Sequence, residues 1–333
     1  MTVDLALPDG PAIAGLAFRT FRGPEDFPGM LAVYQAAHAA ECLEDVTSLE
    51  DFARNYATLV NCDPTRDLVI AEVDGKAVAY ARVFWQDLVE GGRSYELFGF
   101  VDPAWRRRGL GGAMLRHNER RLREIAAAHP DVAPKWFGSE GADTNAGNTA
   151  LLESEGYERA RFWYDMVAPT LHAIEEAPMP EGLEIRPVTR DQYDAIWDAS
   201  AEAFRDHWGM AEWTDEDRTR FMADPHNADP VLWRVGWDGD EIAGVITTTV
   251  PVEENEAHGR SRVYVASVSV RRPWRRRGLA RALLSSSLIA AREAGYTSAS
   301  LGVDTDSPTG ATDLYRSLGF EPERTFTTWR KPL

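Results

Sequence analysis

Two short segments of the chain combine arginines and glycines in an order that could hold a phosphate group. The first is Arg106-Arg107-Arg108-Gly109-Leu110-Gly111-Gly112 and the second is Arg275-Arg276-Arg277-Gly278-Leu279-Ala280-Arg281. Each lies between an apolar, β-branched stretch and an Ala- and Leu-rich stretch, which predicts a turn from a strand into a helix. The first turn of a helix presents backbone N–H groups without intrahelical partners, and arginine pairs bidentately with phosphate oxygens. We therefore expect each segment to bind a phosphate or pyrophosphate.

The arrangement occurs twice, and this repetition weakens the simpler interpretation of each segment as a solvated basic corner. Val101 and Val270 end the two predicted strands, and the first arginine follows by the same step, from 101 to 106 and from 270 to 275. Chance recurrence of such a pattern in equivalent contexts is improbable. We interpret the chain as a tandem repeat.

The two halves also share the order of their predicted elements. Each half begins with a strand and a helix, at 16–21 and 24–40 in the first and at 183–188 and 190–204 in the second. Each half then continues with a hairpin that turns at Asp-Gly, followed by the strand-turn-helix segment, another strand, a helix and an aromatic-rich strand. After an irregular lead-in over 1–14, we expect an N-terminal domain at 15–168, a Pro- and Glu-rich linker at 169–182 and a C-terminal domain at 183–333.

The pattern Arg/Gln-x-x-Gly-x-Gly/Ala between a strand and a helix resembles the acetyl-CoA pyrophosphate loop of the GNAT acyltransferase superfamily. Both segments fit it, and the chain has no Gly-x-x-x-x-Gly-Lys-Ser/Thr loop and no dinucleotide-binding Gly-x-Gly-x-x-Gly after a first strand. The resemblance covers nearly the whole chain. It implies an α/β (α+β) protein with two GNAT folds in tandem, each a mixed, splayed central sheet flanked by helices.

The resemblance also implies acetyl-CoA as cosubstrate and a place for its pantetheine arm. The strand before each loop should splay from the next strand, so that the arm lies between them and pairs with exposed backbone groups. In this sequence those positions are Gly99, Phe100 and Val101 in the first half and Val268, Ser269 and Val270 in the second. Together with the residues of the two loops they form the predicted acetyl-CoA sites.

Acyl transfer from a thioester to an amine benefits from an acid that protonates the leaving thiolate, because a free thiol has a pKa of about 8.5. GNAT enzymes commonly use a tyrosine four residues before a Gly-aromatic pair. The resemblance places that role on Tyr315 in the second half, whereas the first half has Leu152 there. GNAT enzymes also frequently have an asparagine seven residues before this tyrosine. The first half has Asn145 at that position, and the second half has Pro308. We expect a degenerate N-terminal domain and a catalytic C-terminal one.

The general base is less defined by the resemblance. The superfamily often places a glutamate six residues before the strand-end valine, but Tyr264 and Tyr95 stand there. Glu96 is adjacent in sequence, yet one step along a strand turns a side chain to the other face. A polar loop enters the second of these strands, so Glu256, or His258 in the same loop, acting through water is the predicted substitute. The alternative for that loop is a solvated acidic surface.

The acceptor site of the fold lies between the first helices and the sheet. Aromatic, acidic and histidine side chains gather at the end of the predicted helix in the second half, at Phe204, Asp206, His207 and Trp208. Aromatic faces and carboxylates suit an amine or sugar-like ligand. The same aromatics could instead pack the helices together. The matching segment of the first half, 38–45, is less aromatic.

The composition limits the partners. Hydrophobic residues make up 44% of the 333, and no apolar run approaches the roughly 20 residues that span a bilayer. The net charge of −17 disfavours nucleic acid and anionic membranes as partners. Cys42 and Cys62 lack neighbours at metal-ligand spacing, which predicts reduced structural thiols and no metal site. We expect a cytoplasmic protein, a monomer or homodimer.

These observations favour an N-acetyltransferase that moves an acetyl group from acetyl-CoA to a primary amine of a small molecule. The amine could belong to an amino-sugar, an aminoacyl group or a thiol conjugate. The alternative is a tandem protein that binds acyl-CoA as a regulatory ligand without turnover, which the missing glutamate and Pro308 leave open. Release of free thiol in the presence of amines separates the two.

Overall fold

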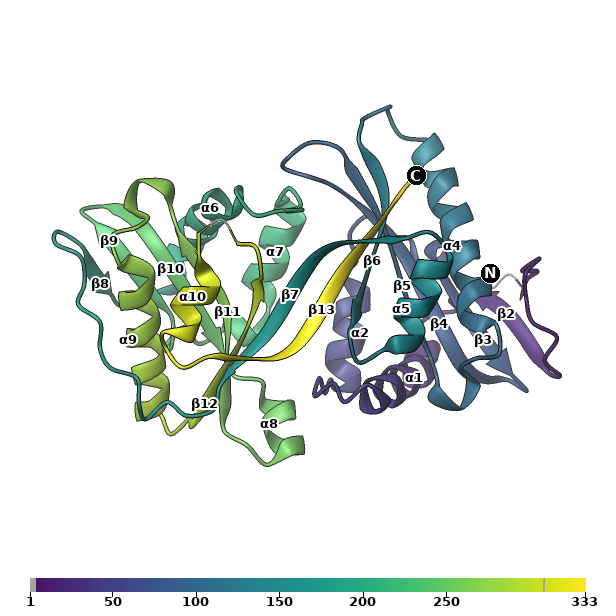
Figure 1. The fold of residues 1–333 in the computed structure, drawn as a ribbon, viewed down its shortest axis with the longest axis horizontal. Coiled ribbons are helices and arrows are strands. Elements are labelled where there is room, and N and C mark those ends of the chain that lie inside the picture. The colour runs from purple at the N-terminus through teal and green to yellow at the C-terminus, as the bar shows by residue number, and fades with distance from the viewer. Residues whose placement is uncertain (1–3, 308) are drawn as a thin grey trace. The chain divides into compact units, whose positions relative to one another are not determined.

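The chain forms two compact units in a computed structural model that describes residues 4–307 and 309–333. Unit 1 comprises the chain up to Arg161 together with Phe326–Leu333, and unit 2 comprises Phe162–Thr325. Figure 1 shows the elements of both units along the chain. Each unit is a mixed sheet flanked by helices, as the sequence predicts.

Unit 1 is built on a sheet with the strand order β1-β2-β3-β4-β5-β6-β13. Its strands are β1 (Asp4–Leu5), β2 (Leu16–Thr20), β3 (Leu68–Val73), β4 (Lys76–Asp87), β5 (Arg93–Val101), β6 (Lys135–Ala142) and the last part of β13 (Glu321–Pro332). Its helices are α1 (Phe27–Ala40), α2 (Leu49–Ala57), α3 (Pro64–Asp67), α4 (Leu110–Ala127) and α5 (Ala146–Ser154). Among the described residues of this unit, β5 and β6 pair in parallel, and the pairs β1–β2, β2–β3, β3–β4, β4–β5 and β6–β13 are antiparallel.

Helices cover both faces of the unit 1 sheet. The apolar side of α4, with Leu110, Met114 and Leu122, packs on one face. Phe27 and Met30 of α1 and Phe52 of α2 pack on the other face. Because strand side chains alternate between faces, each apolar helix buries one set of them. Figure 1 shows α4 and the α1–α2 pair on these two sides.

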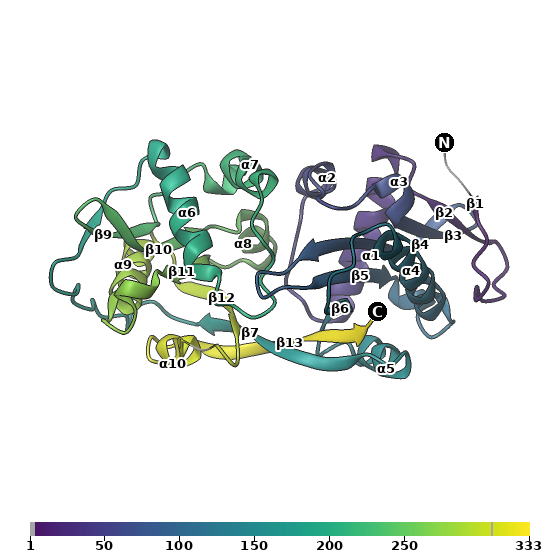
Figure 2. The ribbon, with the colours of Figure 1, turned by 90° about the horizontal axis from the view of Figure 1, so that it is seen from above.

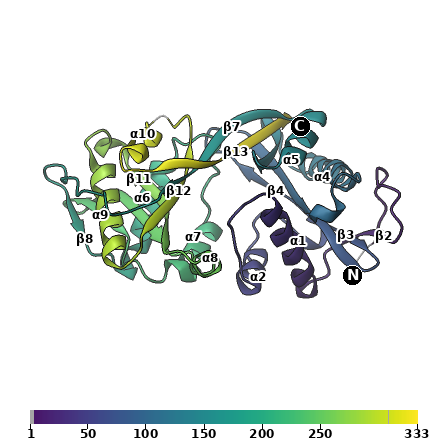
Figure 3. The same ribbon diagram turned by 60° about the horizontal axis from the view of Figure 1, so that its bottom comes forward.

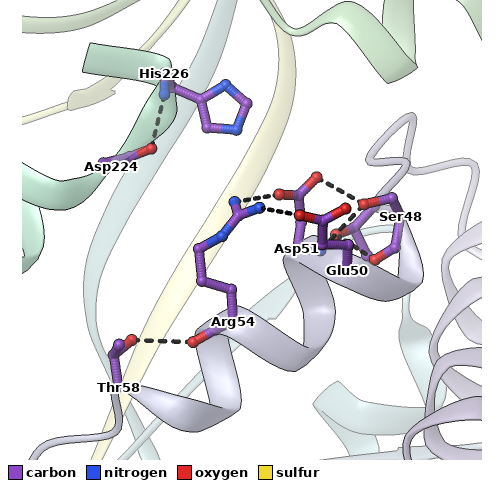
Figure 4. Close-up of polar contacts among 8 residues, drawn as sticks. Ser48, Glu50, Asp51, Arg54, Thr58, Asp224 and His226 are labelled. Carbon is purple, nitrogen blue, oxygen red and sulfur yellow. Dashed lines mark hydrogen bonds and ion pairs between the residues drawn. The ribbon is translucent and has the colours of Figure 1, made fainter. Parts of the chain in front are cut away.

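Local hydrogen bonds fix the start of α2. The Ser48 hydroxyl accepts a hydrogen bond from the backbone N–H of Asp51 at 3.1 Å, as a helix N-cap does. Arg54 in the last turn pairs with Asp51 and, at 3.4 Å, with Glu50 (Figure 4). Ser48 therefore sets the first residue of this helix.

Figure 4 also shows a turn in unit 2, where the Asp224 carboxylate accepts a hydrogen bond from the backbone N–H of His226 at 2.9 Å.

A buried ion-pair network joins β2, β3 and the entry to α1 in unit 1. The Arg19 guanidinium lies 2.7 Å from Asp26 Oδ1 and 2.5 Å from Glu72 Oε1, and all three residues are buried. Removing one partner of a buried ion pair leaves the other charge uncompensated. The network should therefore be far more sensitive to substitution than its surface neighbours.

We predict that Arg19→Met lowers the free energy of unfolding of unit 1 by about 3–5 kcal/mol. The measurement is urea unfolding followed by tryptophan fluorescence. Arg22→Met is the matched control, because the more exposed Arg22 lies 3.7 Å from Glu72 and should contribute at most about 1 kcal/mol. Equal losses in the two variants would show that burial of Arg19 is not what makes the network costly to break.

Unit 2 repeats the architecture, with the strand order β7-β12-β11-β10-β9-β8. Its strands are β7 (Glu158–Ala168, the part from Phe162), β8 (Glu184–Arg186), β9 (Arg234–Asp238), β10 (Glu241–Thr249), β11 (Arg262–Val270) and β12 (Ser298–Asp304). Its helices are α6 (Tyr193–Phe204), α7 (Asp215–Ala223), α8 (Val252–His258), α9 (Leu279–Glu293) and α10 (Ala311–Arg316). Here β11 and β12 form the parallel pair.

The two faces of the unit 2 sheet are also covered by helices. Leu279, Leu283 and Leu288 of α9 pack against buried side chains of β10, β11 and β12. Tyr193 and Ile196 of α6 pack against β9 and β10 on the other face. Figure 2 shows α6 and α7 on one side of this sheet and α9 on the other. The site described below lies on the α6 side and at the N-terminus of α9.

The compact units differ from the predicted domains of 15–168 and 183–333. The last strand of each sequence repeat contributes to the other unit: β7 pairs with β12 (Figure 3), and β13 pairs with β6. The division of the chain therefore falls within these two strands, at 161/162 and 325/326. Both strands are long, so one strand can serve two sheets. Sequence repeats alone could not indicate this exchange.

The predicted linker over 169–182 is also part of unit 2. Leu171 and Ile174 are buried in the core beneath α9. The Arg292 guanidinium donates to the carbonyls of both, at 3.3 and 3.1 Å, and the Ala177 N–H donates to the Ser285 hydroxyl at 3.1 Å. Its Pro and Glu content marks an irregular segment, yet buried apolar side chains hold that segment in place.

Two smaller predictions were wrong. The lead-in over 1–14 contains β1, which pairs with β2 through Asp4 and Arg19. The predicted polar loop over 253–258 is the helix α8, which ends at Gly259 in the left-handed conformation. Its closely spaced glutamates fit a solvated helix as well as a loop.

Within 4–307 and 309–333, no helix has the length and apolar character to cross a membrane.

Candidate active site

The two predicted pyrophosphate loops have the same backbone conformation. In each, a short 3-10 turn leads to an arginine with positive φ, Arg107 at 63° or Arg276 at 61°, and then to a glycine that caps the helix. Gly109 has φ 89° and Gly278 has φ 88°. A side chain is strained in this left-handed region, which explains glycine at both positions. The loops end at the N-termini of α4 and α9, where backbone N–H groups point outward.

The first arginine of each loop ties the loop to its own unit. Arg275 donates to the Val270 carbonyl at 2.8 Å and pairs with Asp206 at 2.6 Å. Arg106 makes the corresponding contacts with the Val101 carbonyl at 3.1 Å and with Glu41 at 2.6 Å. Their guanidinium groups are thus engaged within the protein, and their pairing with phosphate stays a prediction. Their backbone remains part of the turn.

The other loop side chains divide by position. Arg107 and Arg276 are exposed and make no hydrogen bond or ion pair with any described residue, so both can face an anion. Arg277 donates to the Glu181 carbonyl at 3.1 Å, Arg108 lies over the Trp105 ring, and Arg281 donates to the Ser317 hydroxyl. Leu110 and Leu279 are buried and therefore pack the helices. The first helical turns contain residues with no side chain or only a methyl group, namely Gly111, Gly112 and Ala280.

Both units contain the predicted splay next to their loops. In unit 2 the parallel pairing of β11 and β12 runs from Arg262 to Tyr264 and stops. In unit 1 the pairing of β5 and β6 runs from Arg93 to Glu96 and stops. The strand ends Val268–Val270 and Gly99–Val101 therefore lie beyond the paired part. Their backbone groups on that side can pair with an extended ligand, as the pantetheine prediction requires.

A β-bulge distinguishes unit 2 from unit 1. The register of β10 and β11 shifts between Thr247, opposite Ser267, and Thr248, opposite Val265, which leaves Ala266 as the extra residue. The pairing of β4 and β5 has no such shift over Ala79–Asp87. A bulge leaves backbone groups unpaired and redirects neighbouring side chains. Unit 2 thus exposes additional backbone groups beside its open strand end.

The bulge changes which residues correspond between the repeats. Counting back from Val270 across the bulge, Tyr264 matches Glu96 rather than Tyr95. Tyr95 is fully buried on the α4 face, and Glu96 lies on the opposite face, as predicted from alternation. Burial raises the pKa of Glu96, and this effect exceeds the lowering of the pKa by the hydrogen bond from the Ser94 hydroxyl and by the charge of Arg330. Unit 1 therefore carries a carboxyl group where unit 2 carries a phenol.

Tyr315, the predicted acid, lies on α10 in the core region of unit 2. Its side chain is buried, and its ring lies 6.0 Å from the ring of Phe320. Its hydroxyl makes no hydrogen bond to a described residue. Burial raises the pKa of Tyr315, with a smaller contribution from Tyr264. A raised pKa keeps the phenol protonated throughout the neutral range, as a proton donor requires.

The corresponding position of unit 1 has no proton donor. Leu152 is buried among the residues that pack α4 and α5 on the sheet. Asn145 caps α5 by accepting from the Asn148 N–H at 2.9 Å, and its amide donates to Glu41 at 2.7 Å. Asn145 therefore has a structural role here. Its counterpart Pro308 lies outside the described residues.

The sheet face toward the first helices differs most between the units. In unit 2 this face carries small hydroxyl side chains, Thr247, Ser267 and Ser269. The matching residues of unit 1 are Arg82, Phe98 and Phe100. The Ser267 hydroxyl is buried without a hydrogen-bond partner among the described residues. A buried polar atom without a partner is uncommon and fits a surface that receives a polar ligand.

Aromatic side chains fill the same face of unit 1. The ring of Phe100 lies 5.0 Å from Tyr34 and 5.4 Å from Tyr80, and Arg82 lies over Phe98 at 4.6 Å. The sequence comparison of 38–45 with the second half missed this packing, because the aromatics come from the strands below. The signal was present in Phe98 and Phe100, which replace two serines.

The predicted acceptor residues of unit 2 have separate roles. Phe204 packs on Trp213 at 5.8 Å and on His207 at 4.6 Å, which is the helix-packing alternative. The guanidinium groups of Arg272 and Arg275 hold the pKa of Asp206 well below its usual range. Asp206 thus pairs with the loop arginines, and its contact with an amine stays a prediction. Trp208 is half-buried.

His207 is the member of this group on which the charge of Asp304 acts. Burial lowers the pKa of His207, while the carboxylate of Asp304 at the end of β12 acts in the opposite direction. A lowered pKa leaves the imidazole neutral near pH 7, able to accept a proton or a hydrogen bond. His207 and Asp304 therefore border the polar face described above.

Glu256, the predicted base, lies on the exposed helix α8. Its side chain makes no hydrogen bond or ion pair within the part of the chain that the structure describes. Its neighbour Asn255 is bound to the start of β11. The Asn255 amide donates to the Arg262 carbonyl at 2.8 Å, and the Arg262 N–H donates to Asn255 Oδ1 at 3.1 Å. No contact links Glu256 to Tyr315, so its catalytic role stays a prediction. His258 is also exposed on this helix.

The surroundings of the two cap glycines also differ. A Cβ on Gly109 would lie 3.4 Å from the Cβ of Pro11, whereas no described atom stands within 4 Å of that point on Gly278. The N-terminal segment thus approaches the loop of unit 1. The loop of unit 2 is free on this side. Cys42 is exposed and Cys62 is half-buried, and neither forms a disulfide with a described residue.

We predict that Gly278→Val lowers the affinity of unit 2 for CoA by at least about tenfold, because a side chain forces the turn out of its left-handed conformation. Calorimetry with CoA measures the effect. Gly295→Val is the matched control, since Gly295 has φ 95° at the other end of α9 and equal free space. Equal loss of CoA affinity in both variants would indicate a general effect of strain on α9.

Comparison with known proteins supports the assignment of both repeats. A model of the acetyltransferase (GNAT) family matches residues 32–132 and 193–320. A mycothiol acetyltransferase of Kineococcus radiotolerans is 33% identical over 305 residues, covering 89% of this chain and 92% of that protein. A mycothiol acetyltransferase of Clavibacter michiganensis is 31% identical over 79% of each chain. The crystal structure of a GCN5-related N-acetyltransferase from Sphaerobacter thermophilus has a TM-score of 0.71 at 25% identity, covering 98% and 97% of the two chains.

Proposed function

Since the chain belongs to the acetyltransferase (GNAT) family, we propose that its unit 2 transfers an acetyl group from acetyl-CoA to a primary amine of a small molecule. The observation that carries this proposal is the combination of an open pyrophosphate loop, a splayed and bulged strand and Tyr315 in one unit. Unit 1 has the loop and the splay but not the bulge or the tyrosine. Its role under this proposal is structural or regulatory.

The proposed reaction uses these groups in sequence. The pyrophosphate of acetyl-CoA binds the N–H groups at the start of α9 and faces Arg276. The pantetheine arm pairs with the open edge of Val268–Val270. The neutral amine nitrogen attacks the thioester carbonyl, a C–N bond forms and the C–S bond breaks. The departing thiolate takes a proton from Tyr315, which is restored by the proton that the nitrogen loses.

The acceptor of this proposal is a small polar amine. Hydroxyl groups of Thr247 and Ser267 and the imidazole of His207 line the face beside the open strand end, where unit 1 has aromatics. Such a surface suits a ligand rich in hydroxyl or amide groups. The relatives named above are mycothiol acetyltransferases, and the length and asymmetry of this chain resemble mycothiol synthase. An amino-sugar, an aminoacyl compound or a thiol conjugate fits these features.

The test is acetyl transfer by the purified protein with a panel of D-glucosamine, L-serine methyl ester and L-cysteine methyl ester. Mass spectrometry detects the N-acetyl product, and release of CoA thiol measures the rate where the acceptor carries no thiol. Amine-dependent product formation supports the proposal. Tight CoA binding without product from any small amine would favour a non-catalytic acyl-CoA-binding protein.

A further inference from the structure

On the α6-side face of unit 2, the glycine position at 302, here called the notch, is bordered partly by the first sequence repeat. Gly302 of β12 stands opposite Asp165 of β7 in the strand pairing. The point where a Cβ would stand on Gly302 lies 3.6 Å from the Tyr264 hydroxyl and 4.0 Å from Asp165 Oδ1. Two polar groups from different strands thus border a position that has no side chain.

Alternation along the strands places this notch on the acceptor side of the sheet. Leu301 and Val303 belong to the core beneath α9, so Gly302 between them faces the other way. In β7, Met166 is in that same core, so its neighbour Asp165 also faces away from α9. The notch therefore shares a face with the serines of β11 and with Asp304, which lies two residues from Gly302.

The Asp165 carboxylate is held near this face without a partner of its own. It is half-buried and makes no hydrogen bond or ion pair with a described residue. The charge of Arg324 acts on Asp165, but the Arg324 guanidinium pairs with Glu323 at 3.1 Å. Burial raises the pKa of Asp165 because it disfavours the charged carboxylate. A bound cation would stabilise that charged form. Tyr264 beside it is partly exposed.

We propose that Asp165 binds the acceptor amine in its ammonium form on entry, before that nitrogen releases a proton to water and attacks as the neutral amine, and thereby selects cationic amines. This inference rests on the proposed function of unit 2 and names a residue that the sequence pattern did not single out. The first repeat would then supply a specificity-determining group to the catalytic unit through the exchanged strand β7. A C-terminal repeat starting at 183 would lack this group. Strand exchange thus links the two repeats in function as well as in fold.

The test compares Asp165→Asn with Asp240→Asn in the full-length protein, with the amine of the panel that gives the highest turnover. Asp240 is an exposed carboxylate in the β9–β10 turn. For Asp165→Asn we expect the KM of the amine to rise about 10- to 100-fold, the range for one charge-assisted contact. The KM of acetyl-CoA and inhibition by the uncharged N-acetyl product should stay unchanged. Asp240→Asn should resemble the wild type.

A second variant tests the notch itself. Gly302→Val adds a side chain that a strand accepts readily and that fills the space between Tyr264 and Asp165. The amine KM should rise while the fold and acetyl-CoA binding persist. An unchanged amine KM in both Asp165→Asn and Gly302→Val would overturn the proposal. If the wild type acetylates no amine, the proposed function fails, and calorimetric binding of D-glucosamine to the same variants still decides the role of Asp165.

Discussion

Turnover of the Tyr315→Phe variant should fall by roughly 100- to 10,000-fold, the usual range for loss of a positioned general acid. The substitution keeps the ring that contacts Phe320 at 6.0 Å and removes the hydroxyl alone. That hydroxyl makes no hydrogen bond to a described residue, so folding should lose little. Steady-state kinetics should show a lower kcat, and calorimetry should show nearly unchanged CoA affinity.

The matched control for Tyr315→Phe is Tyr157→Phe in unit 1. Tyr157 is also buried, and its hydroxyl donates to Glu119 at 3.1 Å. Loss of that bond should cost about 1 kcal/mol of stability and leave turnover close to the wild type. Tyr315→Phe with a wild-type kcat would show that Tyr315 merely packs, and the thiolate would then leave without this acid.

Acetylation by the Ser267→Phe variant should fall on the order of 100-fold in kcat/KM for the amine. The substitution gives unit 2 the aromatic residue that Phe98 supplies in unit 1, in place of a hydroxyl that is buried without a partner among the described residues. Filling a ligand site in this way costs several kcal/mol of binding, and each 1.4 kcal/mol is about tenfold. CoA affinity should change little.

Two further variants separate loss of space from loss of the hydroxyl. Ser267→Ala keeps the space open and should lower kcat/KM much less than Ser267→Phe. Phe98→Ser in unit 1 should leave acetyl transfer unchanged, although it removes the ring beneath Arg82. Full activity of Ser267→Phe would place the acceptor elsewhere than on the α6 face of unit 2.

The amino-acid pattern predicts the features that depend on local sequence. Gly109 and Gly278 stand where a strand turns into a helix, and the recurrence of that pattern is enough to identify both loops. Tyr315 and Leu152 differ in chemical type, so their contrast is visible from their spacing to the Gly-aromatic pair. Apolar periodicity likewise predicts the helices and strands that carry these residues.

Features that depend on pairing between distant segments could not be predicted in this way. The exchange of β7 and β13 leaves each repeat intact in sequence, yet it places Asp165 opposite Gly302. The bulge at Ala266 keeps the spacing from Val270 to Arg275 unchanged and still shifts Tyr264 to the face of Glu96. The charges of Arg275 and Asp206 cancel because the helix end meets the loop, a contact between residues 69 positions apart.

The central claim is that acetyl transfer occurs in unit 2, and the most direct test compares turnover in Gly278→Val with that in Gly109→Val. Both glycines cap a helix, with φ of 88° and 89°, so the two substitutions impose the same backbone strain on equivalent loops, and Gly109→Val in addition brings a side chain against Pro11. We expect Gly278→Val to lose amine acetylation and Gly109→Val to retain it. Retained activity in Gly278→Val together with lost activity in Gly109→Val would contradict the account and place the reaction in unit 1.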